Sequence, residues 1–214
     1  MIKKISLATL LTLSSLSASD TLKPMLQMGY DWGGTTLRVV EHNTLSYGRD
    51  VNKIRAGQGL SFEAGAAISN DNSNMELQFL VGYKFDSDRD YNGEVTWDVI
   101  PFTALAMFKS HRWKIGGGVT YHLNPELSGS FDGYDNNGDY FNDRVDNEYD
   151  NAIGGIAQIQ YRATEALSIG VKATFIEYDL INSLPGVEEA KTVDGNSIGI
   201  VFNYTFGNER SRFR

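Results

Sequence analysis

The segment between Asn124 and Asn151 holds the densest set of possible metal ligands in this chain. It carries eight carboxylates against one cation, Arg144. An Asp-x-Asn-x-Asp run inside it has the spacing with which a calcium loop begins, but Tyr140 stands where that loop needs a glycine, and an aspartate replaces the final bidentate glutamate. We interpret the segment as a solvated acidic loop. Calcium binding is the alternative, with the candidate ligands Asp135, Asn137, Asp139 and Asp146.

A histidine followed by hydroxyl side chains is the second pattern relevant to chemistry. His122 is expected on the inward face of a strand, and Ser128 and Ser130 follow it in the acidic segment. Nucleophilic catalysis needs a hydroxyl or thiol, a base within hydrogen-bond reach and a group that orients the base. A single histidine is more often a hydrogen-bonded structural residue. The sequence therefore predicts no catalytic site, no metal and no cofactor.

Charged side chains also recur on one face of alternating segments. In residues 75–85 every odd position is apolar, and Glu76, Gln78 and Lys84 fall at even positions. A period of two is typical of a strand with one apolar and one polar face. In a closed membrane barrel the polar face points inward, where charges must be paired. The expected interior residues are Arg55, Glu63, Glu76, Gln78, Lys84, Lys114, Gln158, Gln160, Lys172 and Asn203.

Eight strands of this kind are predicted along the chain. Gly33–Gly34 interrupts the first strand and predicts a kink, and Pro101 interrupts the fourth and predicts a bulge. A bilayer accepts a sheet only as a closed barrel. The sequence thus predicts an all-β fold, an eight-stranded antiparallel up-and-down transmembrane β-barrel. The predicted strands are residues 25–40, 53–69, 75–85, 94–109, 112–123, 152–162, 166–180 and 196–206.

The apolar face of each strand is expected to meet lipid. This assignment points the following residues outward: Ile54, Ala56, Val95, Trp97 and Val99. Aromatic residues gather near both strand ends, as the interfacial girdles of membrane barrels do. One predicted girdle contains Tyr83, Phe85, Trp97, Tyr121 and Phe175, and the other contains Trp113, Tyr161, Tyr204 and Phe206.

The chain begins with the pattern of an export signal. Lys3 and Lys4 precede a short apolar run, and small residues follow up to Ser19. We therefore expect residues 1–19 to be a signal peptide, 20–206 the barrel and 207–214 a short periplasmic tail. Without Lys3 and Lys4 the chain has 17 basic and 27 acidic residues, a net charge of −10. This charge argues against nucleic acid as a partner, and the absence of cysteine excludes disulfides.

The connections between the predicted strands alternate in length. The short ones are 70–73, 110–111 and 163–165, and the long ones are 41–52, 86–93, 124–151 and 181–195. Outer-membrane barrels have short periplasmic turns and long outer loops. The sequence therefore predicts a protein of the cell outer membrane, with both mature termini in the periplasm.

The last predicted strand carries a family resemblance. Residues 197–206 resemble the last-strand signal of bacterial outer-membrane proteins, in which a polar residue and a glycine precede alternating apolar residues that end in Phe. The matching residues are Ser197, Gly199, Phe202, Tyr204 and Phe206, although residues 207–214 follow that final Phe. Over about residues 25–206 the chain resembles the small outer-membrane β-barrels of the OmpA, OmpX and OmpW type. The resemblance implies recognition by the barrel-assembly machinery and contact with outer-membrane lipid, including lipopolysaccharide.

Three functions are compatible with these patterns. The favoured one is a structural role in envelope integrity or surface interaction, with the interior plugged by polar side chains. The second is a narrow, porin-like channel for ions or small solutes, as the resemblance to OmpW implies. The third is a lipid-modifying enzyme, but the His-x-Ser arrangement associated with lipid A deacylases is absent because Asn124 stands two residues after His122. Between calcium binding and a solvated loop stands an intermediate hypothesis, in which the acidic segment shares divalent ions with phosphates of the outer-leaflet lipid.

Overall fold

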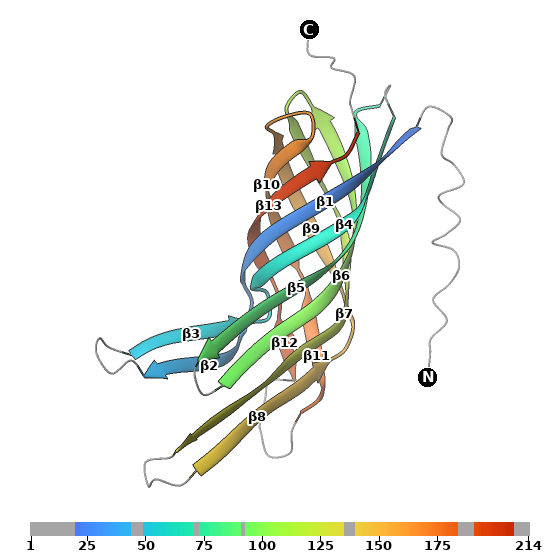
Figure 1. The fold of residues 1–214 in the computed structure, drawn as a ribbon. Helices are drawn as coiled ribbons and strands as arrows, with labels where there is room; N and C mark the ends of the chain where they lie inside the picture. Colours follow the sequence, from blue (N-terminus) through green and yellow to red (C-terminus); the bar gives the residue numbers. More distant parts are fainter. Residues whose placement is uncertain are drawn as a thin grey trace.

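The chain folds as a closed antiparallel ring of β-strands (Figure 1). The computed structural model describes residues 20–43, 49–70, 73–90, 93–134, 140–183 and 191–207. In these ranges the ring closes where the first strand meets the last, and Met28 pairs with Phe202. This confirms the predicted fold class. The ring contains, in order, β1 (Asp20–Gly33), β4 (Gly59–Asn70), β5 (Met75–Asp90), β6 (Gly93–Ser110), β7 (Trp113–Tyr134), β9 (Ala152–Arg162), β10 (Leu167–Phe175) and β13 (Ser197–Thr205).

Alternate side chains of every strand point outward, and together they give the ring an apolar outer wall. Phe62, Phe79, Phe102 and Phe202 each expose between 42 % and 49 % of their surface. Water does not tolerate so continuous an apolar surface, whereas a lipid bilayer does. In the part of the chain that the structure describes, no helix is long and apolar enough to cross a bilayer.

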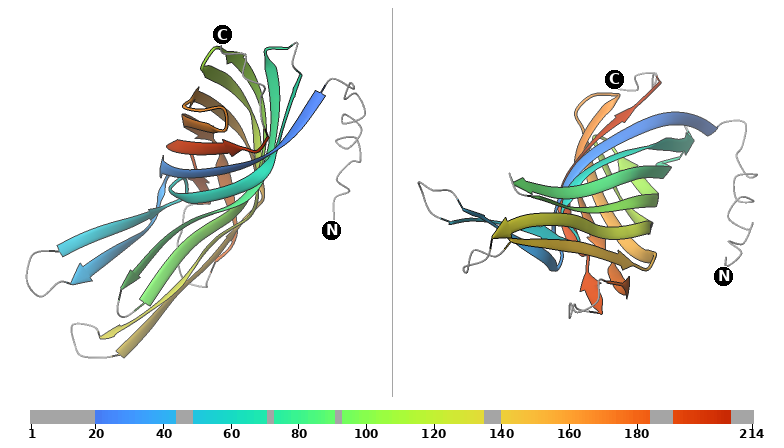
Figure 2. Two further views of the ribbon diagram at one scale, coloured as in Figure 1. Left: turned by 45° about the horizontal axis from the view of Figure 1, so that its top comes forward. Right: turned by 60° about the horizontal axis from the view of Figure 1, so that its bottom comes forward.

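The two ends of the barrel differ. At the turn end, short links follow Asn70, Ser110 and Arg162. At the opposite, hairpin end, several strands project beyond the ring (Figure 2). The projecting elements are the β2–β3 hairpin (Thr36–Asn43 and Arg49–Arg55), the far halves of β5, β6 and β7, β8 (Tyr140–Tyr149), β11 (Glu177–Asn182) and β12 (Thr192–Asp194).

Within the described residues, each of the long connections predicted from the sequence therefore contains strand. The second half of β7 runs through the predicted acidic loop, and Glu126 to Tyr134 pair with β8. Strand β5 continues to Asp90, and β11 pairs with both β12 and β8. A hairpin satisfies its own backbone hydrogen bonds, so charged side chains facing water do not prevent a strand. We name the sheet formed by the far halves of β5, β6 and β7 together with β8 the overhang.

Irregular backbone marks the positions where the ring ends and the projecting parts begin. Gly33 and Gly34 have φ values of +134° and +83°, which L side chains rarely adopt, and they separate β1 from β2 at the predicted kink. The register between β6 and β7 shifts between Asp98 and Ile100, close to the predicted bulge at Pro101. The extra residue belongs to β7, where Asn124 has a φ of +47°.

Strand β6 shows that one strand serves two environments. Its odd-numbered residues point inward along the whole stretch from Val95 to Met107. The prediction that Val95, Trp97 and Val99 point outward is wrong, because all three are buried. Beyond the bilayer the outside of the sheet is water, so the polar face points outward there and the apolar face inward. The same reversal buries two further residues predicted to face lipid, Ile54 and Ala56.

Candidate functional site

A buried ion pair fills the half of the lumen nearer the turn end. The Lys114 ammonium on β7 lies 2.7 and 3.0 Å from the two carboxylate oxygens of Glu76 on β5. Gln78 donates to the same carboxylate at 2.7 Å, and Gln160 on β9 approaches Gln78 at 3.5 Å. These side chains are at most 5 % exposed. The pair therefore satisfies both charges inside the barrel, as burial requires.

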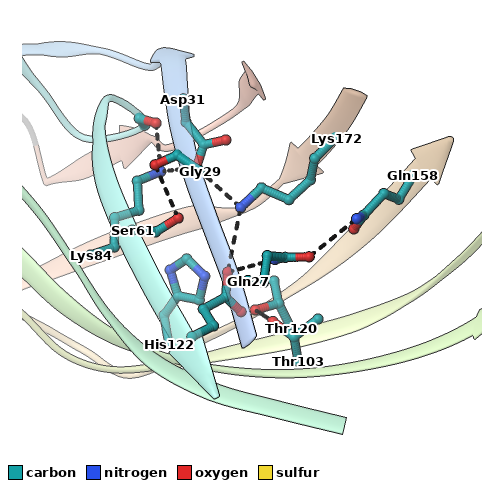
Figure 3. A network of polar contacts seen from close by, with 12 residues as sticks. Gln27, Gly29, Asp31, Ser61, Lys84, Thr103, Thr120, His122, Gln158 and Lys172 are labelled. Atoms are coloured by element: carbon teal, nitrogen blue, oxygen red, sulfur yellow. Dashed lines mark hydrogen bonds and ion pairs between the residues drawn. The ribbon is translucent and has the colours of Figure 1, made fainter. Parts of the chain in front are cut away.

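A second ionic cluster occupies the middle of the lumen (Figure 3). We name Asp31, Glu63, Lys84 and Lys172 the four-charge network. Lys84 and Lys172 lie 2.9 and 3.2 Å from the Asp31 carboxylate, and Lys172 lies 3.7 Å from Glu63. Gln27 also donates to Glu63 at 2.9 Å. Two anions and two cations from four strands thus neutralise one another.

The lumen contains most of the charged residues predicted for it. Glu63, Glu76, Lys84, Lys114 and Lys172 are buried there, and so are Gln78, Gln158, Gln160 and Asn203. Arg55 differs, because it is half-buried at the end of β3, outside the ring. Its neighbours Ile54 and Ala56 occupy the buried positions instead. The cause is again the reversal of polarity at the hairpin end.

The cavity beside the four-charge network is small. A cavity of about 10 Å³ lies beside the four-charge network, lined by Ser61, Thr103, Thr120 and His122 among others. This volume is about that of one water-sized probe. A larger depression of about 550 Å³ is lined by outward-facing residues such as Leu26, Phe62 and Phe202, and also by the inward-facing Glu63 and Asn203.

An apolar cluster covers the lumen at the hairpin end. The rings of Trp97 on β6, Tyr149 on β8 and Tyr178 on β11 meet edge to face, with centroids 5.4 Å apart in both pairs that include Trp97. The hydroxyl of Tyr178 lies 2.6 Å from Nδ1 of His122 on β7, which fixes the cover to the barrel wall. We name this buried set the cover cluster; it comprises Ile54, Ala56, Val95, Trp97, Leu127, Val145, Tyr149, Ala152, Ile176, Tyr178 and Val193.

Comparison with known proteins identifies the architecture. A family model described as the outer membrane protein beta-barrel domain matches residues 5–206. The chain belongs to this family. Membership of this family places the protein in the outer membrane, which the strands of this outer-membrane barrel span. A search of curated proteins finds no match.

Three solved structures illustrate the likeness. Ail, the attachment invasion locus protein of Yersinia pestis, solved with the heparin analogue sucrose octasulfate, has 9% identity and a TM-score of 0.47 over 87% of this chain and 98% of Ail. Neisserial surface protein A has 9% identity and a TM-score of 0.46 over 87% and 99% of the two chains. The outer membrane protease OmpT from Escherichia coli has 10% identity and a TM-score of 0.36 over 87% and 96%.

The predicted assembly-signal residues of this outer-membrane barrel lie on both faces of β13. Phe202 and Tyr204 point outward, as does Phe206 directly after the strand. Gly199 points inward and is buried, while Ser197 begins the strand. The structure thus places the apolar members of the motif against lipid. Their role as an assembly signal stays a prediction.

The hydrogen bonds of His122 do not form a nucleophile–base pair. Ser61 and His122 line the same small cavity. The Ser61 hydroxyl contacts the Gly29 carbonyl oxygen at 3.5 Å, whereas Nδ1 of His122 contacts Tyr178. Ser128 and Ser130, the hydroxyls considered from the sequence, lie on the outward face of β7 in the overhang. His122 is thus a structural anchor for the cover cluster, which the sequence analysis had not recognised.

Three carboxylates lie side by side on the outward face of the overhang. Asp98 on β6 is opposite Glu126 on β7, and Glu126 is opposite Glu148 on β8. Like charges directly opposite one another destabilise a sheet. The Tyr83 hydroxyl donates to Asp98 at 2.8 Å and so offsets part of this repulsion. This acidic row lies in the overhang, beyond the apolar wall of the barrel.

We expect Glu126→Gln to stabilise the overhang at neutral pH. Partial burial, followed by the charges of Asp98, Asp146 and Glu148, raises the pKa of Glu126 above its ordinary value. A carboxyl group with a raised folded-state pKa contributes stability that is present below its unfolded-state pKa and is lost as the pH rises through the folded-state pKa. The urea midpoint of the wild type should therefore fall relative to that of Glu126→Gln as the pH rises above about 4.3.

The matched control for this prediction is Glu165→Gln, which removes an exposed carboxylate at the turn end. Unfolding of both variants is followed in lipid vesicles over a pH series. A Glu126→Gln midpoint that equals the wild-type midpoint at every pH would contradict repulsion within the acidic row.

Of the four candidate calcium ligands, the structure describes Asp146. Asp135, Asn137 and Asp139 lie outside the described residues. Asp146 is exposed on β8, opposite Ser128. Within the described ranges, no three His, Cys, Asp or Glu side chains come together as a metal site would require. Calcium binding stays an alternative from the sequence alone.

Proposed function

We propose that this outer-membrane barrel is a non-enzymatic, non-conducting envelope protein that holds the overhang at the cell surface for interaction. The single observation that carries the proposal is the filled lumen. The Glu76–Lys114 pair, the four-charge network and the cover cluster succeed one another along the barrel axis. An eight-stranded barrel is just wide enough for its side chains to fill it.

The proposed orientation puts the hairpin end outside the cell and both mature termini in the periplasm. Its support is the contrast between the two ends, because short periplasmic turns and longer outer connections are typical of these barrels. The acidic row also needs an aqueous surrounding beyond the bilayer. The predicted signal peptide at residues 1–19 lies outside the described residues, and so does all of the predicted tail at 207–214 except Gly207.

The proposed partners are lipids and the assembly machinery. The apolar wall fits the acyl chains of outer-membrane lipid, including lipopolysaccharide. The outward carboxylates of Asp98, Glu126 and Glu148 would repel lipid phosphates directly, so divalent ions shared with those phosphates are the proposed link at the membrane surface. Recognition of β13 by the barrel-assembly machinery is proposed from its sequence motif.

Single-channel recording in planar bilayers tests the proposal. The mature protein is refolded, and folding is verified by a heat-dependent change in gel mobility. We expect no discrete openings, because each layer of the lumen is blocked by packed side chains. A reconstituted porin shows that the bilayers report conductance. Reproducible openings of the folded protein would replace the proposal with the narrow-channel alternative.

Lipase and deacylase assays on the same refolded sample test the non-enzymatic part. His122→Ala is the control, because His122 is the histidine in the lumen and its contact with Tyr178 is structural. We expect no turnover by either protein. Turnover that the wild type shows and His122→Ala lacks would assign a catalytic role to this histidine.

A further inference from the structure

The inward face of β13 complements both of its neighbours at the seam where the barrel closes. Asp31 on β1 and Lys172 on β10 both pair with Gly199. We name these three residues the seam row. One position along the strand face, Val201 lies between two glycines, Gly29 on β1 and Gly170 on β10. Strand β13 therefore has a glycine where both neighbours carry long side chains, and a valine where both neighbours have glycine.

Gly199 leaves the space in which the seam row forms its ion pair. A Cβ atom added at Gly199 would lie 2.0 Å from Oδ1 of Asp31, a distance that requires the carboxylate to move. Without that side chain, the Asp31 carboxylate and the Lys172 ammonium approach to 3.2 Å, although β13 separates their strands. Figure 3 shows Lys172 and Lys84 reaching the Asp31 region from opposite sides. The ion pair thus depends on glycine at this position.

A slip of β13 by two residues would keep its apolar face toward lipid, so lipid contact alone does not exclude it. In one such register Val201 would stand between Asp31 and Lys172. Its branched side chain would fill the space that the ion pair needs, and both charges would stay buried without each other. The two registers therefore differ in the contacts of the inward side chains at the seam, but not in the contacts of the outward side chains with lipid.

Closure of the seam also balances charge. Strands β1, β4 and β5 contribute Asp31, Glu63 and Lys84, a net charge of −1, whereas Lys172 on β10 contributes +1. These charges meet only when β1 pairs with β13. The Glu76–Lys114 pair differs, because it joins β5 and β7 across β6 and forms without the seam. The four-charge network thus requires closure of the barrel, whereas the Glu76–Lys114 pair does not.

We propose that the seam row sets the register in which the first and last strands join, and that its ion pair forms in the closing step of folding. Gly199 is then a positioning residue for the Asp31–Lys172 contact. This role is independent of whether the protein conducts or binds a surface partner.

Disulfide formation across the seam tests the register, since the chain has no native cysteine. Met28→Cys with Phe202→Cys reports the observed register, because these outward residues are directly paired. Met28→Cys with Tyr204→Cys reports the two-residue slip, because diagonal neighbours lie about 7–8 Å apart, too far for a disulfide. Refolding from urea into phospholipid vesicles is sampled over time under oxidising conditions.

Gly199→Ala should slow the observed-register cross-link more than about tenfold and produce the slipped one. If Gly199→Ala does not fold, Asp31→Asn/Lys172→Met is used, which keeps Gly199 and leaves Glu63 and Lys84 as a balanced pair. This variant should fold and should also produce the slipped cross-link.

Lys114→Met is the matched control, because it breaks an ion pair that does not cross the seam. It should form only the observed-register cross-link, at the wild-type rate. The proposal is overturned if Gly199→Ala, or Asp31→Asn/Lys172→Met in its place, closes as Lys114→Met does. Equal slipping in Lys114→Met would overturn it too, since register would then depend on general stability.

Discussion

Replacing Lys114 with methionine is expected to lower the free energy of unfolding by about 3–5 kcal/mol, the usual loss when one partner of a buried ion pair is removed. The Glu76 carboxylate is 3 % exposed and would be left buried without its cation. Gln78 would still donate to it, but one amide does not compensate a buried charge. Methionine has a similar length, so the loss reports charge more than packing.

Urea titration in lipid vesicles, read from the heat-dependent gel shift, measures this loss. Glu76→Gln/Lys114→Met is the matched double variant, in which an amide oxygen still accepts from Gln78 and no charge is left unpaired. It should recover most of the stability lost in Lys114→Met. If the double variant is as unstable as the single one, the loss comes from packing and the ionic explanation fails.

Trp97→Ala is expected to cost about 3–5 kcal/mol, because it removes the largest side chain of the cover cluster. Trp97 is fully buried and contacts the rings of Tyr149 and Tyr178, so its loss leaves a cavity between the overhang and the barrel. Hydrogen exchange should increase in β8 and β11, which the cluster joins to β6. The lumen should stay closed to ions, because the four-charge network lies beneath the cover.

Trp97→Phe is the control for this prediction. The indole N–H has no hydrogen-bond partner among the described residues, so phenylalanine loses contact area without leaving a buried acceptor unpaired. Its cost should be clearly smaller than that of Trp97→Ala. Equal costs for the two variants, or unchanged exchange in β8 and β11, would show that the cluster does not hold the overhang.

The ring of the barrel could be predicted from sequence because lipid imposes a simple rule on it. Every outward residue must be apolar. Alternation in segments such as 75–85 therefore predicts that the segment is a strand, which of its faces meets lipid, and which residues share that face. The same rule placed Glu76, Lys84, Lys114 and Lys172 on the inward face, where the structure has them. It did not give their partners, because pairing across the lumen depends on shear between strands distant in sequence.

The rule failed at the hairpin end for a physical reason. There the outside of the sheet meets water, so Val95 and Trp97 point inward and Thr96 and Asp98 outward. A charged segment such as 124–151 was interpreted as a loop, although an amphipathic hairpin in water has the same composition. The polar alternation of Arg144, Asp146 and Glu148 was the available signal for β8.

The exchange of polarity along β6 also determines the insertion depth of the protein. Phe102 and Phe108 are outward and apolar, whereas the outward residues Glu94, Thr96 and Asp98 are polar, and the strand keeps one phase throughout. Adding or removing one pair of residues between these stretches would shift the hydrocarbon boundary by about two residue rises, or 6–7 Å measured along the strand. The length of the apolar stretch on this one strand therefore determines how well the barrel wall matches the thickness of the bilayer.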